Sequence, residues 1–263
     1  MTDVSQPSTP YRMPTVRAVS ADDIRAALLA GVEDFRRAPA YGLFFGAIYA
    51  FGGLFLIAAV AWMAMPWLAY PLAAGFALIG PFVAVGLYEV SRRLEAGLPL
   101  SWGAVLGAAY AQSGRQLAWM AFVTLFIFLM WMYQVRLLLA LFLGFQSFSS
   151  FRGFLTVVFT TVDGWLFLAV GHVVGAALSI LVFSLTVVSY PLLLDRDTDF
   201  VTAMITSVKA VVTSPRPMIG WAVIVVAALV VSAVPMLMGL LVTLPILGHT
   251  TWHLYRRAVA AEI

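Results

Sequence analysis

Long apolar runs constrain this chain most strongly. Several segments of about 20 residues are almost without polar side chains, and that is the length a helix needs to cross roughly 30 Å of hydrocarbon. Hydrophobic residues make up 63 % of the 263 positions, more than a soluble domain of this size can bury. Short alternating segments of about ten residues, which are typical of a membrane β-barrel, are absent. We therefore predict an all-α, multi-pass membrane protein.

The hydropathy pattern predicts six transmembrane helices, arranged as three hairpins. They cover residues 42–64, 69–91, 117–140, 164–190, 218–234 and 237–255. The last two lie within one apolar stretch, where Pro235 predicts a break and a tight helical hairpin. The expected organisation is a flexible tail over 1–19, one membrane domain over 20–257 and a short C-terminal segment over 258–263.

The basic residues predict the orientation of these spans. Of the 15 basic residues, all except Arg136 and Arg152 fall on one side of the predicted membrane. Loops rich in Lys and Arg face the cytoplasm. We therefore expect both termini to be cytoplasmic, which requires an even number of spans.

Three short amphipathic segments precede the first, third and fifth spans. Their apolar residues recur every four positions: Ile24, Leu28 and Val32; Trp102, Leu106 and Tyr110; Phe200, Met204 and Val208. This spacing predicts helices lying in the membrane interface. Asp23, Ser101 and Asp199 stand where these helices would begin, and each is expected to cap its helix.

The spacing also suggests a threefold internal repeat over about 20–97, 98–195 and 196–257. Pro39 and Pro215 follow Asp23 and Asp199 at the same distance, and two later segments match in register. These segments contain Pro81, Tyr88, Arg92 and Arg93 in the first copy and Pro245, Trp252, Arg256 and Arg257 in the third.

Acidic residues concentrate in the segment YPLLLDRDTD, residues 190–199. Asp195, Arg196, Asp197 and Asp199 fall where the fourth span ends and the third interfacial helix begins. Acids at a helix N-terminus complement its dipole and free N–H groups, so we interpret them as a solvated turn with a cap. A catalytic or metal-binding acidic cluster is the alternative.

Four ionisable residues inside the predicted spans are candidates for a polar site, because such residues are costly in lipid. They are Glu89, His172, His249 and His253. Glu89 and His253 would either meet at the inner mouth of the bundle or simply reach the lipid headgroups. His172 is expected to form a hydrogen bond between helices. The spacing of His249 and His253 also suits a metal or haem ligand pair, although the segment lacks the Glu of a zinc-protease motif.

Two charged residues are expected on the outer side of the membrane. Arg136 lies near the end of the third span, and its long side chain can extend to the surface. Asp163 lies on the same side and could form an ion pair with Arg136.

Motifs for enzymatic chemistry are missing from the sequence. There is no cysteine, and there are only three histidines. Neither a GxSxG nucleophile motif nor a GxxxxGK[ST] phosphate loop is present. We expect a protein that is not an enzyme, with no cofactor, no metal and no nucleic-acid partner.

Three segments resemble a family of bacterial integral membrane proteins of unknown function. They are DDIRAALLAGVEDFRRAP, GPFVAVGLYEVSRRLEAG and SYPLLLDRDTDFVTAMITS, and the resemblance covers about residues 20–257. It implies location in a bacterial inner membrane. Some members carry the label of putative cytochrome c oxidase components, which implies a link to a respiratory complex. Three histidines are too few for the haem–copper catalytic subunit itself.

Two functions follow from these features. The first is a non-enzymatic accessory, assembly or envelope-organising factor that contacts lipid, other membrane proteins or further copies of itself. The alternative is a small-solute transporter or channel whose pathway runs past Glu89, His172, His249 and His253.

Overall fold

A computed structural model describes residues 13–61, 69–111, 115–144 and 151–260. Within these ranges the regular structure is α-helical, as predicted, apart from one isolated β-bridge. The helices are α1 (Ala21–Arg37), α2 (Pro39–Ala61), α3 (Ala69–Glu95), α4 (Trp102–Ala111), α5 (Arg115–Leu143), α6 (Phe151–Thr160), α7 (Val162–Thr186), α8 (Ser189–Asp195), α9 (Phe200–Thr213), α10 (Pro215–Ala233) and α11 (Leu240–Ala258).

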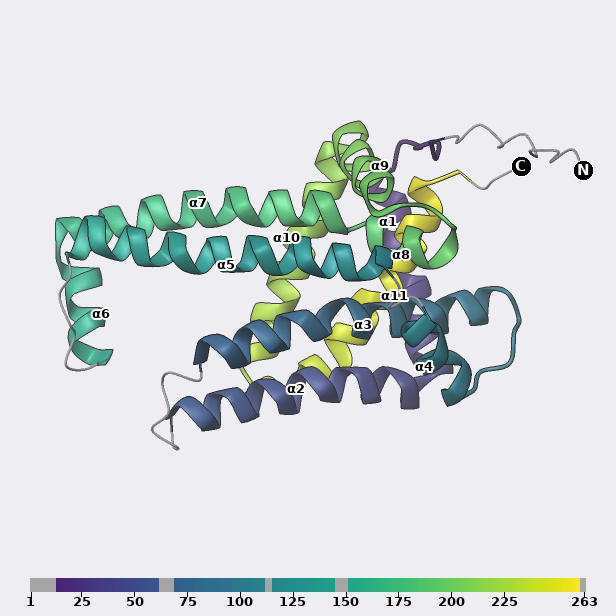
Figure 1. Cartoon of the computed structure of the whole chain (residues 1–263), viewed down its shortest axis with the longest axis horizontal. Coiled ribbons are helices and arrows are strands. Elements are labelled where there is room, and N and C mark those ends of the chain that lie inside the picture. The colour runs from purple at the N-terminus through teal and green to yellow at the C-terminus, as the bar shows by residue number, and fades with distance from the viewer. Residues whose placement is uncertain (1–12, 62–68, 112–114, 145–150, 261–263) are drawn as a thin grey trace, which may run out of the picture.

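The helices form two parts that share one end. Figure 1 shows α5 and α7 side by side as a long pair, with α6 at their far end. A second group consists of α2 and α3, which both pack on α11. The two described ends of the chain lie together, since Thr15 and Ala260 are hydrogen-bonded, and Figure 1 shows them at the end of the molecule where α1, α8 and α9 lie. We call this the terminal end. The main apolar core lies there and includes Ile24, Met120, Leu192, Trp221 and Trp252.

Four of the described helical segments are long and apolar enough to cross a membrane. They are Pro39–Ala59, Gln116–Leu143, Val162–Asp195 and Pro215–Ala233. The other two predicted spans, 69–91 and 237–255, coincide with the helices α3 and α11 but are not among these four. Because α11 ends in the polar segment HTTWHLYRR, its mean hydropathy is low. Six spans therefore remain a prediction.

The turn between α10 and α11 confirms the hairpin predicted at Pro235. Helix α10 ends at Ala233, α11 begins at Leu240, and the two helices pack together. Met236 and Leu237 have positive φ angles of 53° and 64°, which are unusual for residues with a side chain. The reversal is therefore tight.

The three predicted amphipathic segments form the helices α1, α4 and α9, but one predicted cap is wrong. Ser101 accepts a hydrogen bond from the N–H of Ala104 (3.2 Å), and Asp199 accepts from the N–H groups of Val201 and Thr202 (both 2.9 Å). In α1 the N-cap is Ser20 rather than Asp23. The two side chains form a capping box, and the helix therefore begins before Asp23, at Ala21.

The end of the predicted flexible tail is also structured. The N–H of Arg17 donates to the carbonyl of Ala258 (2.8 Å), and the N–H of Ala260 donates to the carbonyl of Thr15 (2.9 Å). The N–H of Val19 donates to Ser214 Oγ (2.8 Å). The prediction of a flexible segment is wrong for 15–19, because this extended backbone bonds to Ala258 at the end of α11, to Ala260 and to Ser214. Residues 1–12 and 261–263 lie outside the described residues.

Two helix junctions share the same backbone geometry. Ala38 ends α1 with φ −133° and ψ 52°, and Ser214 ends α9 with φ −136° and ψ 62°. Each is followed by a proline, Pro39 or Pro215, as the first residue of the next helix. Proline suits this position because an N–H group in the first helical turn has no acceptor within the helix. The absence of this group in proline therefore costs no hydrogen bond.

Candidate functional site

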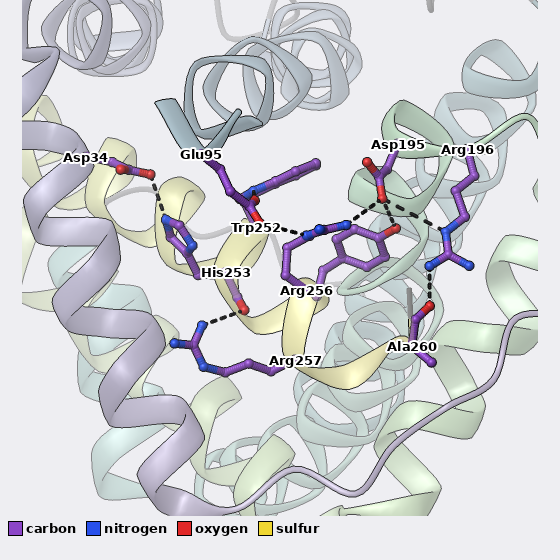
Figure 2. Close-up of polar contacts among 10 residues, drawn as sticks. Asp34, Glu95, Asp195, Arg196, Trp252, His253, Arg256, Arg257 and Ala260 are labelled. Atoms are coloured by element: carbon purple, nitrogen blue, oxygen red, sulfur yellow. Dashed lines mark hydrogen bonds and ion pairs between the residues drawn. The ribbon is translucent and has the colours of Figure 1, made fainter. Parts of the chain in front are cut away.

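The last turns of α11 carry the densest group of polar contacts in the part of the chain that the structure describes. Figure 2 shows residues of this group, which we call the α11 polar cluster. Its members are Asp34, Glu95, Asp195, Arg196, Trp252, His253, Tyr255, Arg256, Arg257 and Ala260. Successive residues of a helix are turned by about 100°. Neighbouring side chains of α11 therefore reach three different helices.

One set of contacts joins α11 to α3. Trp252 Nε1 donates to Glu95 Oε2 (2.9 Å), and Arg256 Nε donates to Glu95 Oε1 (3.1 Å). Trp252 and Arg256 are four residues apart and thus lie on one face of the helix. The Glu95 carboxylate therefore has a separate donor for each oxygen.

A second set joins α11 to α8 through Asp195. Its Oδ2 accepts hydrogen bonds from Tyr255 OH (2.6 Å) and Arg256 Nη1 (3.2 Å), and Arg196 Nε lies 3.9 Å away. Arg196 also donates to the carbonyl of Ala260. The turn that holds Asp195 is thus bound to the last residues of α11.

A third set joins α11 to α1. His253 Nε2 donates to Asp34 Oδ2 at 2.7 Å, and the Asp34 side chain is 8 % exposed. Arg257 Nη1 donates to the His253 carbonyl (3.0 Å), and Arg257 Nε lies 4.0 Å from Asp23 Oδ1. The His253–Asp34 and Arg257–Asp23 contacts both cross the interface at which α1 packs on α11.

Glu89 forms a separate buried ion cluster on α3. It is fully buried and accepts from Arg92 Nε (2.7 Å), Arg92 Nη2 (2.9 Å) and Arg93 Nε (2.7 Å). Arg93 also donates to the carbonyl of Pro99, in the loop before α4. A buried carboxylate is tolerated when charged donors surround it in this way.

Two arginines of these clusters, Arg92 and Arg256, have raised pKa values. The hydrogen bonds from Arg92 to Glu89 raise the pKa of Arg92 above its ordinary value. Partial burial lowers the pKa of Arg256, but the carboxylates of Glu95 and Asp195 outweigh it, so the net shift is upward. Both guanidinium groups therefore stay protonated near neutral pH and cannot act as a general acid or base.

His249 lies in the interface between α11 and α3. It is completely buried, and its Nδ1 is 2.8 Å from Ser91 Oγ. Leu87 packs against the adjacent Gly248. Among the described residues, Nε2 of His249 has no hydrogen-bond partner.

No hydrogen bond joins the four candidate polar residues, all of them described, to one another, so the predicted cluster stays a prediction. Glu89, His249 and His253 lie on the neighbouring helices α3 and α11, but each has a different partner: the two arginines, Ser91 and Asp34. His172 is exposed on α7 and bonds through Nδ1 to the carbonyl of Leu168 in its own helix (2.6 Å). Its predicted bond to another helix is not among the contacts of the described residues.

Arg136 and Asp163 are both exposed, on α5 and in the first turn of α7. Within the described ranges no ion pair joins them, so the predicted pair stays a prediction. The same ranges contain no group of three or more His, Cys, Asp or Glu residues placed to hold a metal ion.

Asp34, Glu95 and Tyr255 were not among the predicted site residues. Asp34 had a usable signal. The buried residues of α1 are Ile24, Ala27, Gly31 and Asp34, with alternating spacings of three and four that define one helix face. An acid on such a face requires a partner across the interface. The interpretation of Asp195 as a solvated turn residue is wrong, because its carboxylate binds Tyr255 and Arg256 of α11.

The sequence comparison identifies the protein class. Residues 69–195 match the family DUF2189, described as a predicted integral membrane protein. This agrees with the resemblance to a membrane family of unknown function. No curated protein and no solved structure matches the chain.

Proposed function

We propose that this integral membrane protein is a non-enzymatic accessory or assembly factor that acts by binding another membrane protein through α5 and α7. It would lie in a bacterial inner membrane with six spans and both termini cytoplasmic. A respiratory complex is the kind of partner that the family resemblance implies.

The observation that carries this proposal is the exposure of α7. Between residues 162 and 186, Gly164 is the only buried position, although the helix continues into the buried segment Ser189–Leu193. Its partner α5 also has few buried residues between Gln116 and Leu143. The parts of these two long helices that other helices do not cover offer a large intramembrane surface.

His172 favours protein over lipid on part of this surface. It lies ten residues into the 25-residue helix α7 and is exposed. At 1.5 Å per residue, this position is about 15 Å from the helix start and near the middle of a membrane. Ionisable side chains at this depth almost always face protein or a water-filled cavity. Exposed Ala169 and Ala176 on either side of His172 permit close helix packing.

The internal polar contacts give less support to a transporter. Glu89, His249 and His253 each have a local partner, and His172 lies on another helix with no recorded contact to them. The matching geometry of the Ala38–Pro39 and Ser214–Pro215 junctions supports the proposed repeat, at least for its first and third copies.

Site-specific photo-crosslinking in cells tests the proposed contact. A photoreactive residue would replace Val173 on α7 or, as a control, Val230 on α10; the two are 71 % and 63 % exposed. We expect one defined protein adduct from position 173, lost in an Ala176→Phe background, and none from position 230. Equal protein adducts from both positions, or only lipid adducts from position 173, would refute the proposal.

A further inference from the structure

We infer that a groove between α7 and α9 binds one anionic phospholipid, with an acyl chain in the groove and the headgroup phosphate at Lys209. The inference adds a lipid ligand to the proposed function and depends on its membrane orientation, with α9 at the inner surface. It does not depend on the proposed protein contact of α5 and α7.

Helix α9 buries polar as well as apolar side chains and leaves apolar side chains exposed. Thr202, Thr206 and Ser207 are buried, and Ser207 Oγ accepts a hydrogen bond from the N–H of Val188 (3.1 Å). The exposed side of the helix carries Val201, Ile205 and Val212. With 14 residues α9 is too short to span the bilayer. Such a helix is stable when it lies in the interface with its apolar side toward acyl chains.

The groove has an apolar lining that suits part of an acyl chain. Its volume is about 300 Å³, and it is lined by Leu185, Val201, Met204, Ile205, Val208 and Lys209. Five of these six side chains are apolar. Leu185 belongs to the last turn of α7, so a chain leaving the groove can continue along the exposed surface of that helix.

Lys209 supplies the charge that selects the headgroup. It is exposed at the edge of the groove, and its recorded contact is a weak one, from Nζ to Met13 Sδ at 3.7 Å. Among the described residues no carboxylate lies within ion-pair distance of it. A lysine on an interfacial helix extends its ammonium group to the phosphate level. An apolar groove with one unneutralised cation complements an anionic phospholipid.

Native mass spectrometry of the full chain in detergent tests this inference, with dioleoyl phosphatidylglycerol and dioleoyl phosphatidylcholine as probes. We expect one tightly bound phosphatidylglycerol and a clear preference for it over phosphatidylcholine. Lys209→Gln should reduce that preference about fivefold. Arg216→Gln, which removes another exposed cation beyond α9, should leave it unchanged.

A second pair of variants tests the groove itself. Val208→Trp fills the groove and should weaken binding of both lipids, whereas Val212→Trp, outside the lining residues, should not. Equal binding of the two lipids by the wild type, or equal effects of the paired variants, would overturn the inference. So would a wild-type dimer that Val208→Trp converts to monomer, because a second copy would then occupy the groove. Lys209→Gln should leave the protein adduct from position 173 unchanged. This result separates loss of the lipid site from loss of the proposed protein contact.

Discussion

His253 Nε2 donates a hydrogen bond to Asp34 Oδ2 across 2.7 Å, joining residues that are 219 positions apart. Both side chains are largely buried. The contact joins α1 to α11 near the terminal end, where α11 also binds α3 through Glu95 and α8 through Asp195. The end of α11 therefore holds three other helices in place.

Removing Asp34 should destabilise the protein strongly. Asp34→Ala leaves the largely buried His253 ring without its acceptor, and a hydrogen bond to a charged group contributes about 1.5–3 kcal/mol. Glu33→Ala changes an exposed acid next to it and should alter the free energy of unfolding by less than about 0.5 kcal/mol. Thermal unfolding in detergent measures both. Equal midpoints for the two variants would show that the contact contributes nothing.

The acidic turn before α9 offers a matched comparison. Asp195→Ala removes the acceptor of Tyr255 and Arg256, and we expect a loss of about 2 kcal/mol. Asp197→Ala alters an exposed acid of the same turn and should be close to neutral. Tyr255→Phe should cost about 1 kcal/mol, because it removes one of these hydrogen bonds. If Asp197→Ala is as damaging as Asp195→Ala, the turn as a whole matters rather than the Asp195 contacts.

Close packing of α1 on α11 depends on Gly31. A Cβ at this position would meet Thr250 Oγ1 and lie 2.7 Å from the Thr250 backbone nitrogen. Gly31→Ala should therefore destabilise the protein by roughly 1–3 kcal/mol. Gly220→Ala on α10 meets open space and should be neutral or stabilising by up to about 1 kcal/mol. The measurement is again the unfolding midpoint, and a harmless Gly31→Ala would contradict the observed helix spacing.

The capping box of α1 should make stability depend on pH in the acid range. Hydrogen bonds from the Ser20 side chain and backbone lower the pKa of Asp23 below its ordinary 3.8. The folded state then binds fewer protons than the unfolded state, so the stabilisation is present above about pH 4 and is lost as the pH falls through the lowered pKa.

Ser20→Ala tests this dependence. It should lower stability by about 1 kcal/mol at neutral pH, and the difference from wild type should shrink as the pH falls below 4. Unfolding midpoints measured across this pH range check it. A difference that stays constant with pH would mean that the Asp23 charge plays no part.

Much of the helix pattern could be predicted from the sequence, because it depends on neighbouring residues. The apolar runs predicted an all-helical membrane protein, Pro235 predicted the reversal between α10 and α11, and Ser101 and Asp199 were recognised as caps. The cap of α1 was misplaced because Ser20 and Asp23 can each accept the N–H groups of a first turn. The resulting capping box sets the start of the helix.

The candidate site depended on the tertiary structure, because its partners are distant in the chain. Glu95 and Trp252 are 157 positions apart, and Asp195 and Tyr255 are 60 apart. Glu89, His249 and His253 could be selected from the sequence because buried charge is costly, and that cost is a property of each residue alone. Which partner each of them binds depends on how α1, α3 and α8 pack around α11. No local pattern in the sequence encodes that packing.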